Sequence, residues 1–146
     1  MNINDASDYF ESLIIKVNKK SEIKIYETFI AILSDLKNKN LTEEELQSIE
    51  EELDMLALKE NPENRKKYFK QKLEAFKEYL KEELFLITEG YYTAIGIALG
   101  MAFGAAFISV FDSAASISFG LIIGLIIGYN MDAEAEKQNR VLKTKR

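Results

Sequence analysis

The chain has 146 residues, of which 47% are apolar and 29% are charged, and its formal net charge at pH 7 is -5. It contains no histidine and no cysteine, which excludes histidine acid–base chemistry, cysteine nucleophiles, thiolate metal sites and disulfides. We therefore expect no enzymatic activity, no cofactor and no metal site in a chain that has room for one small domain and an appendage.

Charge and glycine content divide the chain into three segments. Residues 1–89 carry 14 bases and 20 acids and contain no glycine, whereas residues 90–131 hold all seven glycines and one charged residue, Asp112. Residues 132–146 carry five bases and three acids. The pattern predicts a cytosolic helical domain at 1–89, a transmembrane hairpin at 90–131 and a basic cytosolic tail at 132–146.

The first segment is predicted to be a bundle of about four helices. Ser7 and Ser21 are the predicted N-caps of the first two helices, and Thr42 with Glu45 forms a capping-box pattern before the third. Asn61, which is followed by a proline, is the predicted cap of the fourth. Apolar residues at helical spacing are predicted to face the core; they are Tyr9, Phe10, Leu13, Ile14, Val17, Ile25, Tyr26, Phe29, Ile30, Leu33, Leu36, Leu46, Ile49, Leu53, Leu56, Tyr68, Phe69, Leu73, Phe76, Leu80 and Leu84.

Two charged stretches of this segment are candidate binding sites for ions, nucleic acid or lipid. The acidic stretch 42–54 lacks the alternating ligands and central glycine of a calcium loop, so it is interpreted as a solvated helix face. The basic cluster Arg65, Lys66, Lys67, Lys70 and Lys72 lies in a net acidic segment near the bilayer, which favours anionic lipid headgroups over nucleic acid.

Two apolar runs, 91–111 and 114–131, predict membrane-spanning helices. As helices they are about 31 Å and 27 Å long, and a hydrocarbon core is about 30 Å thick. A single span is excluded because it would place Asp112 at its middle, so we expect a tight turn at 111–113. A buried hairpin of a soluble protein is disfavoured, since 89 residues are too few to surround it. The fourth helix can run directly into the first span, with Gly90 as the hinge.

Basic residues flank both spans and are absent from the predicted turn. They are Arg65, Lys66, Lys67, Lys70, Lys72, Lys77 and Lys81 before the first span, and Lys137, Arg140, Lys143, Lys145 and Arg146 after the second. The positive-inside rule therefore predicts an inner (cytoplasmic) membrane location with both termini in the cytoplasm. Because acids stand where a secretory signal has bases, we expect no cleaved signal.

Six of the seven glycines form two ladders with a spacing of four residues. They are Gly96, Gly100 and Gly104 in the first span and Gly120, Gly124 and Gly128 in the second. This spacing predicts glycine faces that let helix backbones approach closely. A second row on the first span, Ala94, Ala98, Ala102 and Ala106, lies about 200° around the helix from the glycines. We therefore expect the first span to pack within the hairpin on one of these faces and against a second subunit on the other. The predicted helix-packing and oligomerisation residues are the six glycines with Ala98 and Ala102.

The sequences GIALGMAFGAAF and ISFGLIIGLIIGYNMDAEAEKQNRVL resemble the small two-span glycine-zipper membrane proteins of bacteria. The resemblance covers roughly residues 92–142, and it implies an integral membrane hairpin with a basic cytosolic tail. The leading hypothesis is a non-enzymatic membrane protein whose hairpin anchors and oligomerises a cytosolic interaction module. The alternative is a pore-forming or membrane-perturbing effector, of a toxin or defence type, that is gated by the head. The partner of the head is not predicted.

Overall fold

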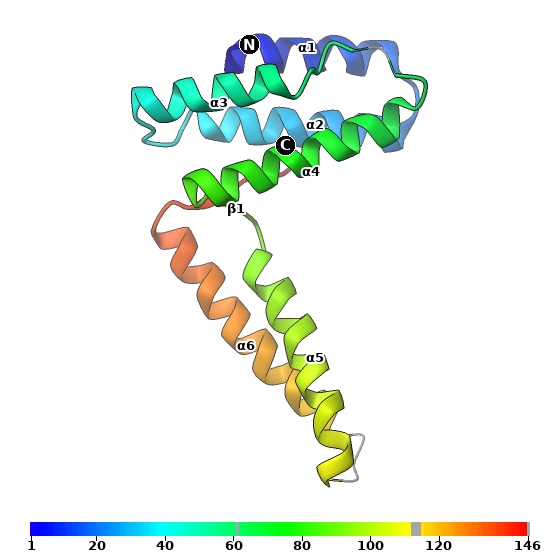
Figure 1. Cartoon of the computed structure of the whole chain (residues 1–146), viewed down its shortest axis with the longest axis vertical. Helices are drawn as coiled ribbons and strands as arrows, with labels where there is room; N and C mark the ends of the chain where they lie inside the picture. Colours follow the sequence, from blue (N-terminus) through cyan, green and yellow to red (C-terminus); the bar gives the residue numbers. More distant parts are fainter. Residues whose placement is uncertain (61, 112–114, 146) are drawn as a thin grey trace. The chain divides into compact units, whose positions relative to one another are not determined.

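A computed structural model describes residues 1–60, 62–111 and 115–145 (Figure 1). The protein is 76% helical, with six helices and a pair of two-residue strands in the described residues. It divides into a head unit, Met1–Ile87 with Leu142–Arg146, and a hairpin unit, Thr88–Val141. The predicted all-α fold class, a helical head followed by a two-helix hairpin, is confirmed.

The first two helices of the head, α1 (Ile3–Lys16) and α2 (Lys20–Leu36), do not begin at their predicted caps. The side chain of Asn2 caps α1 by accepting from the N–H of Asp5 at 2.7 Å, so Ser7 lies inside the helix. Helix α2 begins after Lys19 without a side-chain cap, and Ser21 lies in its first turn. Both serine predictions are wrong because each helix begins before its serine, and in α1 the buried residues already start at Ile3.

Helix α3 (Glu43–Met55) begins as its sequence predicts. The hydroxyl of Thr42 accepts from the N–H of Glu45 at 3.2 Å, and the Glu45 carboxylate accepts from the N–H of Thr42 at 2.7 Å. The capping box is therefore confirmed, and the acidic stretch 42–54 forms a helix whose Ile49 and Leu53 are buried while most of its acids are exposed.

Helix α4 (Arg65–Leu84) starts and ends differently from the prediction. Asn64 is its N-cap and accepts from the N–H of Lys67 at 3.0 Å, so the predicted cap at Asn61, which lies outside the described residues, is wrong. The helix ends at Phe85 in the left-handed conformation (φ 55°), where the N–H of Leu86 donates to the carbonyl of Leu80 at 2.9 Å. This is a hydrogen-bonded helix stop, so α4 does not continue into the next helix.

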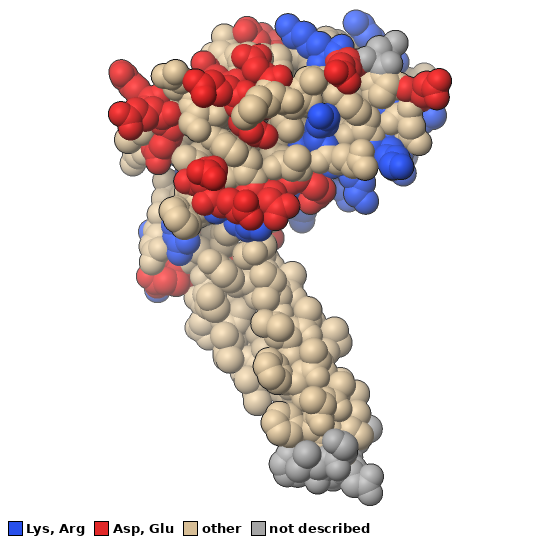
Figure 2. Space-filling view, viewed as in Figure 1, with Lys and Arg blue, Asp and Glu red and all other residues tan. Residues whose placement is uncertain are grey.

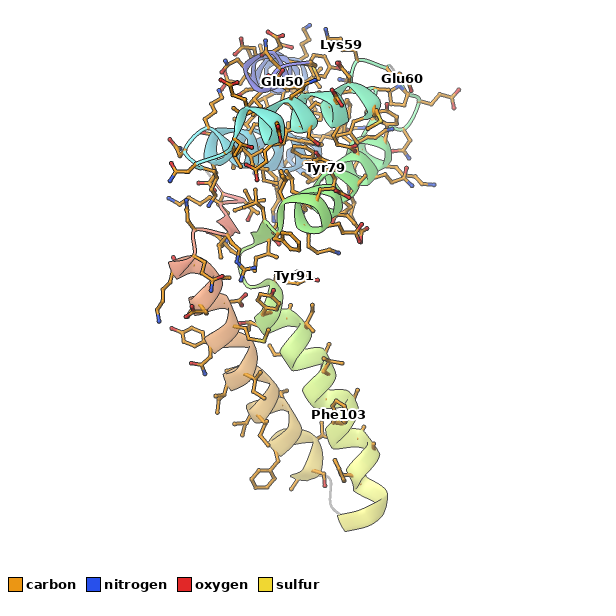
Figure 3. All side chains as sticks on the ribbon, turned by 60° about the vertical axis from the view of Figure 1, so that its left-hand side comes forward. Glu50, Lys59, Glu60, Tyr79, Tyr91 and Phe103 are labelled. Carbon is orange, nitrogen blue, oxygen red and sulfur yellow. The ribbon has the colours of Figure 1, made fainter. Side chains whose placement is uncertain are left out.

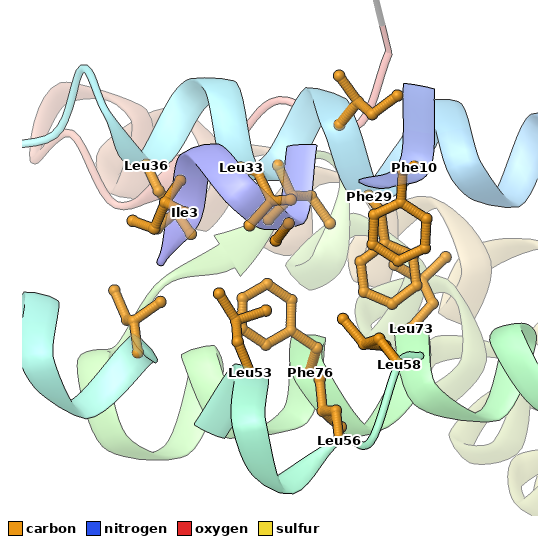
Figure 4. Close-up of a cluster of buried hydrophobic side chains, with 14 of the residues drawn as sticks. Ile3, Phe10, Phe29, Leu33, Leu36, Leu53, Leu56, Leu58, Leu73 and Phe76 are labelled. Carbon is orange, nitrogen blue, oxygen red and sulfur yellow. The ribbon is translucent and has the colours of Figure 1, made fainter. Parts of the chain in front are cut away.

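The core of the head is built on stacked aromatic rings from three helices (Figure 4). Phe10 of α1 stacks on Phe29 of α2 with ring centroids 4.3 Å apart, and Phe69 of α4 meets Tyr26 of α2 edge-on at 5.2 Å. Leu53 adds α3 to the same cluster. Every apolar residue predicted to face this core is buried or half-buried, so the helical spacing correctly identified the inward faces.

The hairpin unit contains α5 (Tyr91–Phe111) and α6 (Ala115–Lys137). Helix α5 has the predicted bounds of the first span, whereas α6 extends beyond Met131 into the predicted tail. Gly90 has a φ of +72° and its carbonyl accepts from Ala94 N–H at 2.9 Å, which opens α5. The predicted turn at 111–113 lies largely outside the described residues. Figure 2 shows the hairpin as a mainly uncharged surface.

Two short strands, β1 (Ile87–Thr88) and β2 (Val141–Leu142), pair with one another. The sequence did not predict them, because two-residue strands carry no periodic signal. Leu142 is fully buried in the head core. Leu142 therefore belongs to the head unit, although it follows the hairpin in the sequence.

Candidate functional site

The glycine faces of α5 and α6 pack directly against one another. A methyl group added at Gly100 would lie 2.9 Å from the carbonyl carbon and 3.2 Å from the Cα of two glycines on α6, Gly120 and Gly124. An added group at Gly124 would lie 2.8 Å from the carbonyl carbon of Gly96. Real Cβ atoms are not found this close to backbone atoms, so only glycine permits the observed separation of the helices.

The same constraint extends along the hairpin. An added group at Gly104 would meet Ile117 Cα at 2.7 Å, and one at Gly128 would meet Thr93 Cα at 2.6 Å. All six predicted glycines therefore lie at one interface within a single chain. Close backbone contact supplies dispersion, which offsets the cost of placing glycine inside helices.

A carboxylate of α6 binds the first turn of α5 at one end of this interface. Asp132 of α6 accepts hydrogen bonds from the backbone N–H groups of Tyr92 and Thr93, each at 2.9 Å. The first N–H groups of a helix lack partners in the helix itself and favour a negative charge. Asp132 therefore caps α5 from the neighbouring helix and sets the register of the pair.

Sequence reasoning did not single out Asp132, although a signal for it exists. Ser116, Gly120, Gly124, Gly128 and Asp132 form one row with a spacing of four residues. Extending the glycine ladder by one step would have placed the carboxylate on the packing face.

The alanine row of α5 is not part of the hairpin interface. Ala94, Ala98, Ala102 and Ala106 are exposed, as their position about 200° from the glycines predicts. The corresponding outer face of α6 is bulkier, since Ile122 and Ile126 are 52% and 53% exposed. The structure thus separates the predicted site residues into an inner glycine set and an outer pair, Ala98 and Ala102.

A groove of about 690 Å³ runs along one flank of the hairpin. Its lining is almost wholly apolar, with walls that include Leu99, Phe103, Phe119 and Ile123, and the glycines form part of its floor. Figure 3 shows Phe103 on α5. The groove therefore offers a mainly apolar surface, with Ser116 as a hydroxyl side chain in its lining.

Among the described residues of the head, one buried side-chain polar atom has no hydrogen-bond partner. Tyr26 is fully buried, and its hydroxyl lacks a hydrogen-bond partner among the described residues. Burial raises the pKa of Tyr26 above its ordinary value, and the nearby positive charge of Arg65 partly opposes that shift. Burial likewise raises the pKa of Glu52, against the opposing charge of Lys72. No cluster of three or more potential metal ligands occurs in the described part of the chain.

Length and composition identify two candidate membrane spans in the described residues, Tyr91–Ile108 and Ala115–Lys137. Most of their residues are exposed in the structure, unlike those of a core helix in a soluble protein. Large apolar side chains such as Phe103, Phe119 and Ile123 are among the exposed ones, as expected of surfaces that face lipid.

Comparison with known proteins supports the membrane interpretation. Residues 88–138 match the family model described as glycine zipper membrane protein. No curated protein and no solved structure matches the chain. The match covers all of α5 and α6 with both glycine ladders. The C-terminal part of the chain therefore resembles glycine zipper membrane proteins, and the predicted resemblance is confirmed.

Proposed function

We propose that the protein is a non-enzymatic integral membrane protein whose glycine-zipper hairpin anchors and oligomerises a cytosolic helical head. The supporting observation is that the two faces of α5 have different surroundings. Its glycine face is used within the chain, and its alanine face is exposed. The absence of histidine and cysteine from the sequence is in keeping with a non-enzymatic role.

The proposed subunit contact uses the alanine face, with Ala98 and Ala102 at its centre. Small side chains every four residues let a second helix approach closely, as the glycines do within the hairpin. Helix α5 is the better candidate for this contact because Ile122 and Ile126 hold a neighbour away from the outer face of α6.

In the proposed orientation the hairpin lies in the inner (cytoplasmic) membrane, and both of its ends face the cytoplasm. Leu142 follows the hairpin and Ile87 precedes it, yet both belong to the head unit. If α5 and α6 span a bilayer, both ends therefore emerge on the side that holds the head. The basic residues that flank the two helices favour the cytoplasmic side.

Cross-linking of the full chain in membranes tests the oligomer. The double variant Ala98→Leu with Ala102→Leu should reduce cross-linked oligomers by about tenfold, which corresponds to ~1.4 kcal/mol. Ala105→Leu is the matched control, because it adds the same bulk at an exposed alanine outside the alanine row. Equal oligomer yields in the two variants and the parent chain would refute the subunit contact.

Dye-loaded liposomes test the alternative class of function. The anchor proposal predicts that the reconstituted protein leaves the dye inside. Release that disappears in the Ala98 and Ala102 double variant would instead support a pore-forming or membrane-perturbing effector.

A further inference from the structure

The last residues of the chain complete the head, although the whole hairpin separates them from it in the sequence. Leu142 is fully buried and belongs to the same apolar cluster as Leu36 and Phe76. We call residues 141–145 the C-terminal clasp.

A polar contact holds the C-terminal clasp on α2. The backbone N–H of Lys143 donates to Oδ2 of Asp35 at 3.2 Å. Asp35 is only 9% exposed, and the same oxygen lies 3.4 Å from Nζ of Lys39. A buried carboxylate requires such partners, so removal of the clasp would leave Asp35 with one donor fewer.

The connection between the clasp and α6 is short. The helix ends at Lys137, and Asn139 adopts a left-handed conformation (φ 57°). The N–H of Arg140 then donates to the carbonyl of Ala135 at 2.9 Å, which closes the helix end. Only residues 138–141 therefore connect the end of α6 to Leu142.

The strand that precedes the hairpin in the sequence pairs with the strand that follows it. β1 follows the stop of α4, pairs with β2 and is followed by Gly90, where α5 begins. Sliding α6 past α5 by one glycine repeat would move it by about 6 Å. The few residues between Lys137 and Leu142 would have to absorb that movement.

We propose that the C-terminal clasp couples the packing of the hairpin to the folding of the head. When the glycine faces are in register, Leu142 fills its place in the head core and Lys143 binds Asp35. When the helices separate or slide, the clasp is withdrawn, which leaves a cavity in the core and opens the head around the C-terminal end of α2. This coupling does not depend on the formation of oligomers.

Hydrogen exchange of the full chain in lipid nanodiscs tests the coupling. Leu142→Ala should speed exchange of the Ile32–Leu36 amides by roughly tenfold or more, because it empties a core position. Lys145→Ala is the matched control at an exposed clasp residue. Gly124→Leu, which must disturb the hairpin, should speed the same head amides, whereas Ile122→Leu on the outer face of α6 should not.

The coupling is also testable in the reverse direction, because energetic coupling between two sites is reciprocal. Leu142→Ala should therefore speed exchange of the Tyr92 and Thr93 N–H groups that Asp132 holds. The Leu142→Ala measurement still tests the coupling if the Gly124→Leu protein fails to insert into the bilayer. Unchanged head exchange in an inserted Gly124→Leu protein, or unchanged Tyr92 and Thr93 exchange in Leu142→Ala, would overturn the proposal.

Discussion

Asp132 near the end of α6 accepts a 2.9 Å hydrogen bond from the backbone N–H of Tyr92 at the start of α5. Its second carboxylate oxygen accepts from the N–H of Thr93 at the same distance. The contact joins residues 40 positions apart in the sequence, and it lies on the row of residues that carries the glycines of α6. Glycine packing and helix capping thus act together to fix one arrangement of the hairpin.

Asp132→Ala is expected to destabilise the hairpin by about 0.5–2 kcal/mol, the usual cost of losing a helix cap. The measurement is the free energy of unfolding of the hairpin helices in detergent micelles. Glu134→Ala is the matched control, since Glu134 is an exposed acid on the same helix. Equal losses in the two variants would show that Asp132 acts only through its charge or its helix propensity.

Gly100→Leu is expected to separate α5 from α6, because its side chain would overlap the backbone of Gly120. The sequence alone predicts that this change reduces oligomers more than Leu99→Ala does. The structure places Gly100 inside the hairpin, so the first effect should be loss of intrachain contact. A cysteine pair introduced across α5 and α6 in this Cys-free chain measures that contact by disulfide yield, and an unchanged yield would count against the close packing.

Thr42→Ala is expected to lower the stability of the head by about 0.5–2 kcal/mol. The change removes the hydroxyl that accepts from Glu45 N–H at the start of α3. Chemical denaturation followed by circular dichroism measures the loss. Thr28→Ala is a suitable comparison, because the hydroxyl of Thr28 only donates to the carbonyl of Lys24 within α2. A smaller loss for Thr42→Ala than for Thr28→Ala would contradict the importance of the capping box.

Tyr26→Phe is expected to leave the stability of the head at neutral pH unchanged or slightly higher, because the buried hydroxyl has no hydrogen-bond partner among the described residues. Burial raises the pKa of Tyr26 above its ordinary value of 10.0, so the folded state disfavours the phenolate. The stability of the parent chain should therefore fall as the pH rises above that value. Denaturation at neutral and alkaline pH should show a smaller alkaline loss in the variant, and an identical loss would show that the folded head does not raise the pKa of Tyr26.

Local sequence signals predicted the parts of the fold that depend on local physics. The capping box at Thr42, the apolar helix faces and the bounds of α5 follow from residues that lie within a few turns of each other. The caps at Ser7, Ser21 and Asn61 were wrong, because each helix began elsewhere. Asn2 and Asn64, which also carry cap-forming side chains, are the caps of α1 and α4.

Long-range partners were not predictable in the same way. Leu142 carries no sign in its own neighbourhood that it belongs to a core built from residues 1–87, and Asp35 has no local feature that points to Lys143. The glycine ladders predicted close packing, but the spacing alone did not determine which face packs within the chain. The structure assigns that role to the glycine face and leaves the alanine face exposed.

In the proposed topology, α5 and α6 cross a membrane as a hairpin, and residues 4 and 145 lie on the same side. Because the chain has no cysteine, the single variants Asn4→Cys, Asp112→Cys and Lys145→Cys can be labelled in sealed vesicles with a reagent that does not cross the bilayer. We expect Asn4→Cys and Lys145→Cys to react from the same side and Asp112→Cys to react only from the opposite side. Reaction of all three from one side would contradict the membrane-spanning hairpin.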